Sequence, residues 1–248
     1  MTRNIKTLDA ILTAEIKSWA GLIDDKEFET VLKEISLKQI VQTSDYYSKI
    51  TQLRKDAFEG YLPEFDQELN EKLDKKQYIY AFQDLSKLEG YAVNNSKLLS
   101  HVLIRQKKVY QAFTLNRIEQ CQKLYDDVVT AEQKMKDGTH AELDISIESK
   151  LRLTRDMLCS INTTQKKYGF SLPDYYQELH DNIFTMAMSH EIKKAQVYLQ
   201  QVEVQGEITS KLYPNLLASV AAFDVCKQNL EHIDYPPVYF QLKGILNN

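Results

Sequence analysis

Apolar side chains recur along this chain at steps of three and four residues, the spacing that places them on one face of an α-helix. Two clear stripes comprise Ile118, Cys121, Tyr125 and Val128, and Ile147, Leu151, Thr154, Leu158 and Ile161. The pattern predicts helices over residues 5–22, 26–59, 63–93, 96–136, 141–168, 173–206 and 212–232. We therefore expect an all-α fold built from antiparallel helical bundles.

Glycine and proline support the same fold class and mark helix ends. The chain has only seven Gly and five Pro, whereas strand-rich folds use many of both at their turns. Pro63 and Pro173 suit the first turn of a helix, where the missing amide hydrogen costs nothing. Gly138 and Gly169 suit the end of a helix. These residues therefore support the predicted boundaries beside them.

Two of the predicted helices contain a point where the pattern changes. Between Met186 and Ile192 the steps of three and four fail, which predicts a kink or short break near Ser189. In the helix that follows Pro63, the side chain of Asp74 is a candidate cap for a new helix. We expect both helices to be interrupted at these points.

An internal repeat is one interpretation of the sequence. Residues 62–69 and 172–179 are identical at five of eight positions, and residues 96–98 match 210–212. The repeat would give two tandem three-helix units of about 110 residues, a period similar to that of spectrin-like repeats. The Trp that is usual in the first helix of those repeats is missing from both copies. One folded-back all-α domain fits the sequence equally well.

The repeat divides the chain into four parts. A first helix occupies residues 1–25, the two bundle copies occupy 26–136 and 140–232, and a tail occupies 233–248. The tail is predicted to be extended, because consecutive prolines preset a polyproline-like backbone.

Composition indicates a globular intracellular protein. Hydrophobic residues make up 43% and charged residues 27%, and the net charge of -4 favours neither nucleic acid nor anionic membrane as a whole-molecule partner. The longest uncharged stretch, residues 212–223, is too short to span a bilayer, and no secretory signal is visible. The three Cys include no C-x-x-C pair, which predicts neither a disulfide framework nor a zinc site. We expect a cytoplasmic, reducing location.

The most specific local signal is electrostatic. Residues 90–118 contain no Asp or Glu. On a helix, four basic side chains of this segment fall within about 80° of one another. This basic ridge comprises Lys97, His101, Arg105 and Lys108. It suits an anionic partner such as an acidic protein surface, a lipid headgroup or a phosphate backbone, and the alternative is a solvated face paired with nearby carboxylates.

A short motif follows the last predicted helix. Pro236, Pro237 and Tyr239 form a P-P-x-Y sequence, which resembles a ligand of WW domains. The resemblance implies an extended peptide that docks in an aromatic groove. The alternative is a stiff segment that folds back on the bundle, with Tyr239, Phe240 and Leu242 as packing anchors.

One arrangement of His and Asp suggests an enzyme. His140, His180, Asp181 and Asp224 occur in an order that resembles the H…HD…D pattern of HD-type metal phosphohydrolases. The resemblance implies an all-helical fold in which these side chains hold a divalent metal that activates water. The small residues usual after the HD pair are missing.

The sequence as a whole favours a function without catalysis. We expect a helical interaction module, such as a scaffold, tether, adaptor, complex subunit or bacterial effector, that binds a protein or an anionic surface and needs no cofactor. The alternative function is the metal-dependent phosphohydrolase. A third is a helical protein of the membrane surface, and sequence-specific binding of nucleic acid is not expected.

Overall fold

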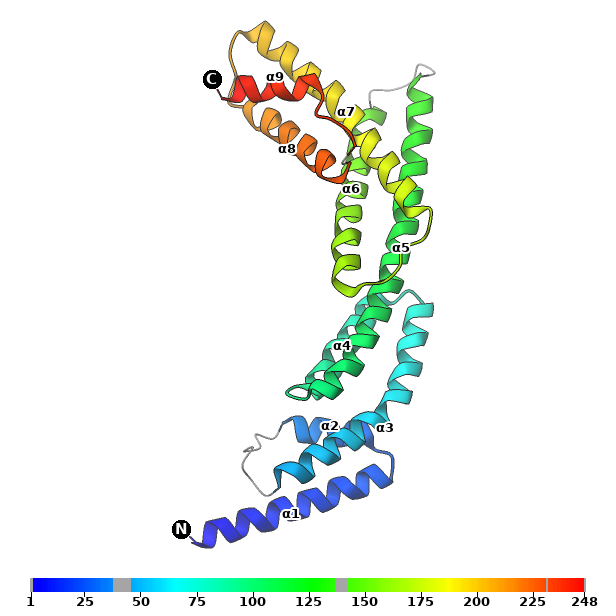
Figure 1. Cartoon of the computed structure of the whole chain (residues 1–248), viewed down its shortest axis with the longest axis vertical. Helices are drawn as coiled ribbons and strands as arrows, with labels where there is room; N and C mark the ends of the chain where they lie inside the picture. Colours follow the sequence, from blue (N-terminus) through cyan, green and yellow to red (C-terminus); the bar gives the residue numbers. More distant parts are fainter. Residues whose placement is uncertain (1, 38–45, 137–141, 231, 248) are drawn as a thin grey trace. The chain divides into compact units, whose positions relative to one another are not determined.

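Helices make up all the regular structure that the computed structural model describes (Figure 1). The model describes residues 2–37, 46–136, 142–230 and 232–247, and the side chains of these residues except 2–9, 136 and 142–145. The helices are α1 Thr2–Asp24, α2 Phe28–Ser36, α3 Tyr47–Asp74, α4 Tyr78–Ala92, α5 Ser96–Lys136, α6 Glu142–Tyr168, α7 Tyr176–Gln205, α8 Tyr213–Asn229 and α9 Pro237–Leu246. The prediction of an all-α bundle fold is confirmed.

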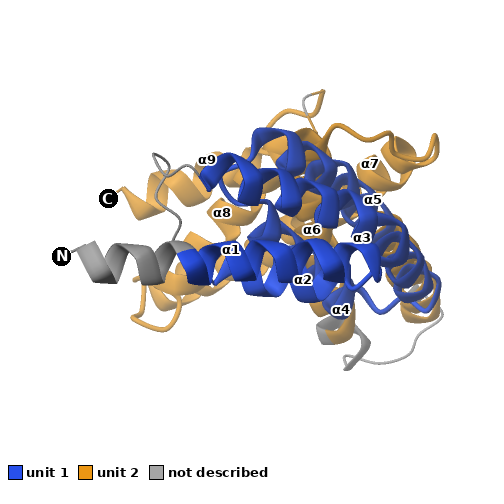
Figure 2. Cartoon of the chain, turned by 90° about the horizontal axis from the view of Figure 1, so that it is seen from below, with its two compact units in different colours: residues 1–113 blue, residues 114–248 orange. Residues whose placement is uncertain are grey.

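The chain forms two compact units, residues 1–113 and 114–248 (Figure 2). The division falls inside α5 and not at the predicted boundary near residues 136–140. The reason is that the apolar stripe of α5 serves two cores. Val102 and Val109 are buried in the core of unit 1, whereas Ile118 and Cys121 are buried in the core of unit 2.

Unit 1 is a two-layer stack of helices. Within it α1 packs against α3, and α2 packs against α4, while each helix also contacts the next one along the chain up to α4. An ion pair between Arg105 of α5 and Asp66 of α3 extends the layer of α1 and α3. Alternation of this kind is typical of stacked helical hairpins.

The two hairpin turns of unit 1 have the same geometry. Lys26 and Lys76 both adopt a left-handed conformation, with φ of 65° and 55°. The amide of the following residue, Glu27 or Gln77, donates to the carbonyl five residues earlier, at 2.8 Å in both turns. This is a Schellman motif, repeated 50 residues apart. The repeat that the structure shows is therefore a helical hairpin.

The matching segments 62–69 and 172–179, which are 110 residues apart in sequence, do not occupy equivalent places in the structure. Pro63 lies inside α3, a helix that changes direction along its length in Figure 1, as expected for a helix with a proline in its interior. Pro173 lies in the connection before α7. The prediction of a helix start at Pro63 is wrong because the residues on both sides of it belong to one buried stripe, which includes Phe58 and Phe65.

The two predicted interruptions have different outcomes. α3 ends at Asp74 and α4 begins at Tyr78, so this break is confirmed, although Asp74 is the last residue of α3 and does not cap α4. The predicted break near Ser189 is wrong, because α7 is continuous from Tyr176 to Gln205. The Ser189 hydroxyl donates to the carbonyl of Thr185 at 3.0 Å, a bond that a helix tolerates.

Unit 2 is built on α7, which packs against α6, α8 and α9. The predicted extended tail is wrong for residues 237–246, because they form α9. Pro237 suits the first turn of this helix, and Val238, Tyr239 and Leu242 are buried in the core of unit 2. Gly138 and His140 lie outside the described residues.

The Schellman turns predict a stabilising substitution. Lys26→Gly should raise the free energy of unfolding of unit 1 by about 0.5–1 kcal/mol, because glycine adopts positive φ without the steric cost of a Cβ atom. The measurement is urea denaturation followed by fluorescence of Trp19, the single Trp, which is 1% exposed in the core of unit 1. Asp25→Gly is the control and should destabilise, since φ is not positive there. A lower midpoint for Lys26→Gly would contradict the prediction.

Candidate functional site

The first turns of α5 are held by a local cap. The Asn95 side-chain oxygen accepts hydrogen bonds from the amides of Lys97 and Leu98, both at 3.1 Å. Such a cap satisfies amides that otherwise have no partner at a helix start. The cap therefore fixes where α5 begins.

Arg105 of the basic ridge is engaged inside unit 1. Its Nε and Nη2 atoms donate to the two carboxylate oxygens of Asp66, at 2.7 and 2.5 Å, and Nη1 donates to the carbonyl of His101 at 2.9 Å. The Arg105 side chain is only 11% exposed. A bidentate pair of this kind binds two helices together. Arg105 therefore joins α5 to α3.

The other three ridge residues have different surroundings. The Lys108 ammonium donates to the side-chain oxygen of Asn70, a neutral partner that leaves the lysine charge uncompensated. The ring of His101 lies 6.4 Å from the ring of Phe58, centroid to centroid. Lys97 is exposed. Of the four ridge residues, Lys97 and Lys108 are therefore the two that present an outward positive charge.

A second set of residues on α5 completes the surface. They are exposed and lie at steps of three and four, opposite the buried Leu98, Val102 and Val109. We call them the outer face: Ser100, Leu103, Ile104 and Lys107. Leu103 is 58% exposed and Ile104 is 65% exposed. These residues were not among the predicted site residues, although their helical angle relative to the buried stripe was available as a signal in the sequence.

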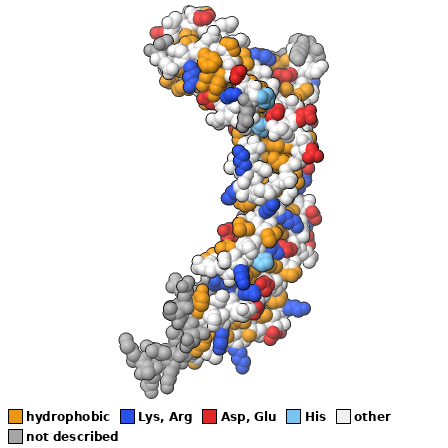
Figure 3. All heavy atoms as spheres, viewed as in Figure 1, with side chains coloured by type: hydrophobic (Ala, Val, Ile, Leu, Met, Phe, Trp, Pro, Cys, Tyr) orange, Lys and Arg blue, Asp and Glu red, His pale blue; other side chains and the backbone are white. Residues whose placement is uncertain are grey.

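The outer face and its lysines form a mixed apolar and basic surface. At 100° per residue, Lys97 and Lys108 lie within about 40° of Ile104. No acidic residue occurs on α5 before Glu119. Figure 3 shows hydrophobic side chains exposed among charged ones on the viewed face of the molecule. The arrangement on α5 suits a partner that offers both apolar groups and carboxylates.

The P-P-x-Y motif is folded into unit 2. Pro236 is extended, with φ of -68° and ψ of 153°, but Pro237 begins α9 and Tyr239 is 7% exposed. The hydroxyls of Tyr235 and Tyr239 both donate to one carboxylate oxygen of Asp224, at 3.0 and 2.9 Å. The motif is therefore not presented as an extended peptide in this conformation. Tyr239 and Leu242 are anchors as expected, whereas Phe240 is exposed.

The predicted metal ligands have other partners. His180 is 4% exposed, and its Nδ1 atom lies 3.0 Å from a carboxylate oxygen of Asp181. Because a carboxylate accepts, Nδ1 carries a hydrogen. The Nε2 atom lies 3.4 Å from the side chains of both Asn162 and Asn229. Asp224 accepts from the two tyrosines of the C-terminal segment.

The four residues of the H…HD…D pattern are thus only partly brought together. His180 and Asp181 are in contact, Asp224 faces α9, and His140 lies outside the described residues. Among the residues that the structure describes, no group of three His, Cys, Asp or Glu side chains could hold a metal ion.

A second polar cluster lies between α7 and α8. The fully buried Ser219 donates to a carboxylate oxygen of Glu191 at 2.5 Å. Burial raises the pKa of Glu191, and the hydrogen bond from Ser219 and the charges of Lys194 and Arg155 oppose this shift only in part. The pair satisfies polar groups at a helix contact, as a structural hydrogen bond does.

The cysteine thiols are unsuited to nucleophilic chemistry. All three are free. Cys121, which lies on a predicted apolar stripe, is buried, and so is Cys226, whereas Cys159 is only partly buried. Burial raises the pKa of Cys121 to about 12, and it also raises the pKa of Cys159 and Cys226. A reactive cysteine needs the opposite shift, because the thiolate is the nucleophile.

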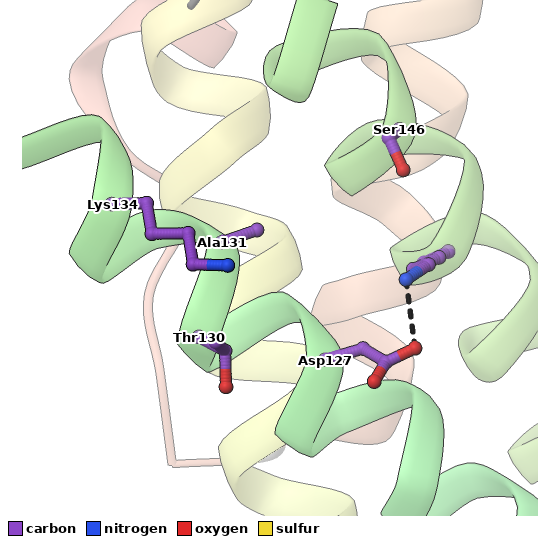
Figure 4. A pocket seen from close by; sticks show the side chains of 6 residues that line it. Asp127, Thr130, Ala131, Lys134 and Ser146 are labelled. Carbon is purple, nitrogen blue, oxygen red and sulfur yellow. Dashed lines mark hydrogen bonds and ion pairs between the residues drawn. The ribbon is translucent and has the colours of Figure 1, made fainter. Parts of the chain in front are cut away.

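A small pocket lies between α5 and α6 in unit 2 (Figure 4). Its volume is about 260 Å³, and its lining comprises Asp127, Thr130, Ala131, Lys134, Ser146 and Lys150. Lys150 donates to Asp127 at 2.8 Å, and the Thr130 hydroxyl donates to the carbonyl of Asp126. Three of its polar side chains, those of Asp127, Thr130 and Lys150, are therefore already bonded within the protein.

Comparisons with known proteins supply no function for these sites. No family model, no curated protein and no solved structure matches the chain. None of the described helices combines the length and the apolar character needed to cross a membrane. The contacts described above are therefore the basis of the functional argument.

The ion pair in unit 1 predicts coupled effects on stability. Asp66→Ala and Arg105→Ala should each lower the free energy of unfolding of unit 1 by about 1–3 kcal/mol, because each leaves a charge without its partner. The double variant should lose less than the sum of the two. Urea denaturation with Trp19 fluorescence measures all three. Additive losses would show that the pair does not bind α3 to α5.

Glu191 predicts a pH dependence of stability in unit 2. A raised pKa in the folded state means that stability is lost as pH rises from the ordinary value of 4.5 through the raised pKa. Glu191→Gln keeps an acceptor for Ser219 and does not ionise. The melting temperature of this variant should therefore rise relative to that of the native protein as the pH increases from 4 to 7. Glu203→Gln, exposed on the same helix, is the control. Parallel melting curves for native protein and Glu191→Gln would exclude this role for Glu191.

Proposed function

We propose that this chain is a non-catalytic helical interaction module, of the scaffold or adaptor class, that binds a protein partner through the outer face of α5 and its flanking lysines. The observation that carries the proposal is the exposure of Leu103 and Ile104 beside three outward lysines, on a helix segment without acidic residues. Exposed apolar side chains ringed by charge are typical of docking sites.

The architecture of unit 1 supports the proposal by analogy. Helical hairpins that stack in two layers present long, regular helix faces to solvent, and repeat proteins use such faces to bind other proteins. The surface on α5 lies on such a helix, and the Asn95 cap and the pair of Arg105 with Asp66 hold that helix in place. A rigid element is a favourable base for a binding site.

The contacts in unit 2 favour this function over a metal-dependent phosphohydrolase. Asp224 is bonded to Tyr235 and Tyr239, and His180 is enclosed by amide and carboxylate side chains. These hydrogen bonds support a structural role for both residues. An intracellular, reducing location is part of the proposal, and the three free cysteines support it.

The proposal predicts a site-specific cross-link. With a photo-reactive amino acid in place of Leu103, the protein should cross-link to a partner protein in cells that express it naturally. The triple variant Lys97→Glu, Lys107→Glu and Lys108→Glu should bind the purified partner about ten times more weakly or worse, because three favourable charge contacts become repulsive. Its folding should be unchanged, since these side chains are exposed.

A matched control separates the site from overall charge. Lys49, Lys166 and Lys193 are exposed lysines elsewhere on the chain, and their reversal changes the net charge by the same amount. This control variant should keep native affinity. Equal weakening by both triple variants, or no cross-linked protein at Leu103, would contradict the proposed function.

A further inference from the structure

The four residues of the outer face have the spacing of a knobs-into-holes packing site. Ser100, Leu103, Ile104 and Lys107 are at positions i, i+3, i+4 and i+7 of α5, and all four are exposed. In coiled coils, four residues at this spacing frame the hole that receives one side chain of the facing helix. Ser100 is the small corner, and its hydroxyl is turned back to the carbonyl of Lys97 at 2.6 Å. A small side chain at this corner suits an incoming side chain between Leu103 and Ile104.

Positive charge lies at both ends of this hole. Lys97 precedes it, and Lys107 and Lys108 end it. None of the ion pairs formed among the described residues includes these three lysines. In coiled coils, residues that flank the apolar seam pair with opposite charges on the facing helix and so choose the partner.

Resting on the proposed function, we infer that the partner presents an acidic amphipathic helix, which packs along α5 with an apolar side chain in the outer-face hole and carboxylates against Lys97, Lys107 and Lys108. The distance from Lys97 to Lys108 along the helix is about 16 Å, so a partner helix of about three turns covers the site. Its sequence should carry apolar residues at steps of three and four with Glu or Asp beside them.

The same features argue against the other anionic partners. Each basic residue near an anionic lipid surface contributes about 1 kcal/mol to binding, and two exposed apolar side chains would bury little apolar surface in the bilayer. A single-stranded nucleic acid stacks its bases on aromatic rings, and the outer face has none. Aliphatic side chains framed by lysines match the aliphatic and carboxylate groups of an acidic helix.

Two designed peptides of about three heptads test the inference. Both carry leucine along the seam, and they differ only in glutamate or lysine at the flanking positions. Binding to the full chain is measured by fluorescence anisotropy. The glutamate peptide should bind, and its affinity should fall about tenfold with added salt and with Leu103→Ser plus Ile104→Ser. The triple lysine-to-glutamate variant should prefer the lysine peptide, whereas the control at Lys49, Lys166 and Lys193 should not.

The outcomes separate this inference from the proposed function. If the glutamate peptide binds no better than the lysine peptide, or if Ser100→Phe, which fills the hole, leaves its affinity unchanged, the inference is wrong. Binding to vesicles with anionic lipid or to a single-stranded oligonucleotide, without binding to the glutamate peptide, also overturns it. A protein cross-linked at Leu103 that contacts the site without an acidic helix would leave the proposed function standing and remove the inference.

Discussion

The orientation of α5 in unit 1 depends on how one guanidinium group is neutralised. Arg105 lies beside the buried stripe of Leu98, Val102 and Val109 and is itself mostly covered. A covered charge is tolerated only with a well-placed counter-charge, and the carboxylate of Asp66 supplies it with two parallel hydrogen bonds. With this side of the helix turned to α3, Leu103, Ile104 and Lys107 remain outside. The interior contact thus decides which residues a partner can reach.

The two helical hairpins of unit 1, α1 with α2 and α3 with α4, depend on a different constraint, which is the closing of tight turns without glycine. Lys26 and Lys76 take the left-handed conformation, and Asn94 does the same before α5 begins. The two lysine turns form the same pair of hydrogen bonds, which use carbonyls at the helix end that would otherwise have no partner. Close helix contacts need glycine at one point, because a Cβ atom on Gly60 would lie 2.5 Å from the ring of Phe28. Turn geometry and this contact together set the spacing of the stack.

Unit 2 shows how polar residues with catalytic potential can serve packing. His180 contacts both Asn162 and Asn229 and so links three helices, and Ser219 bonds to Glu191. Asp224 receives two tyrosine hydroxyls from the last segment of the chain and helps hold α9 on α8. Satisfied buried networks of this kind stabilise one arrangement of helices over others. A sequence pattern of His and Asp does not distinguish such networks from a metal site.

The sequence by itself determined the fold class and most helix boundaries. The helix expected over 96–136 matches α5, and the one over 141–168 matches α6 within a residue, because an unbroken apolar stripe with polar flanks has few alternatives to a helix. It also placed the basic segment of α5, since the absence of acidic residues is visible without any structure. The break after Asp74 was also predicted, but on the side chain of Asp74 as a helix cap, a role that it does not have because it is the last residue of α3.

The features that the sequence did not predict were decided by tertiary structure alone, because they depend on contacts between residues far apart in sequence. Pro63 stays inside α3 because the stripe on both sides of it is buried, and residues 237–246 form a helix because their apolar side chains find a core. The same is true of the candidate site. Only the position of Asp66, 39 residues from Arg105, shows that this arginine is paired inside unit 1 and does not belong to an outward basic surface. Local periodicity reports which residues share a helix face, whereas the partner of that face is a property of the whole fold.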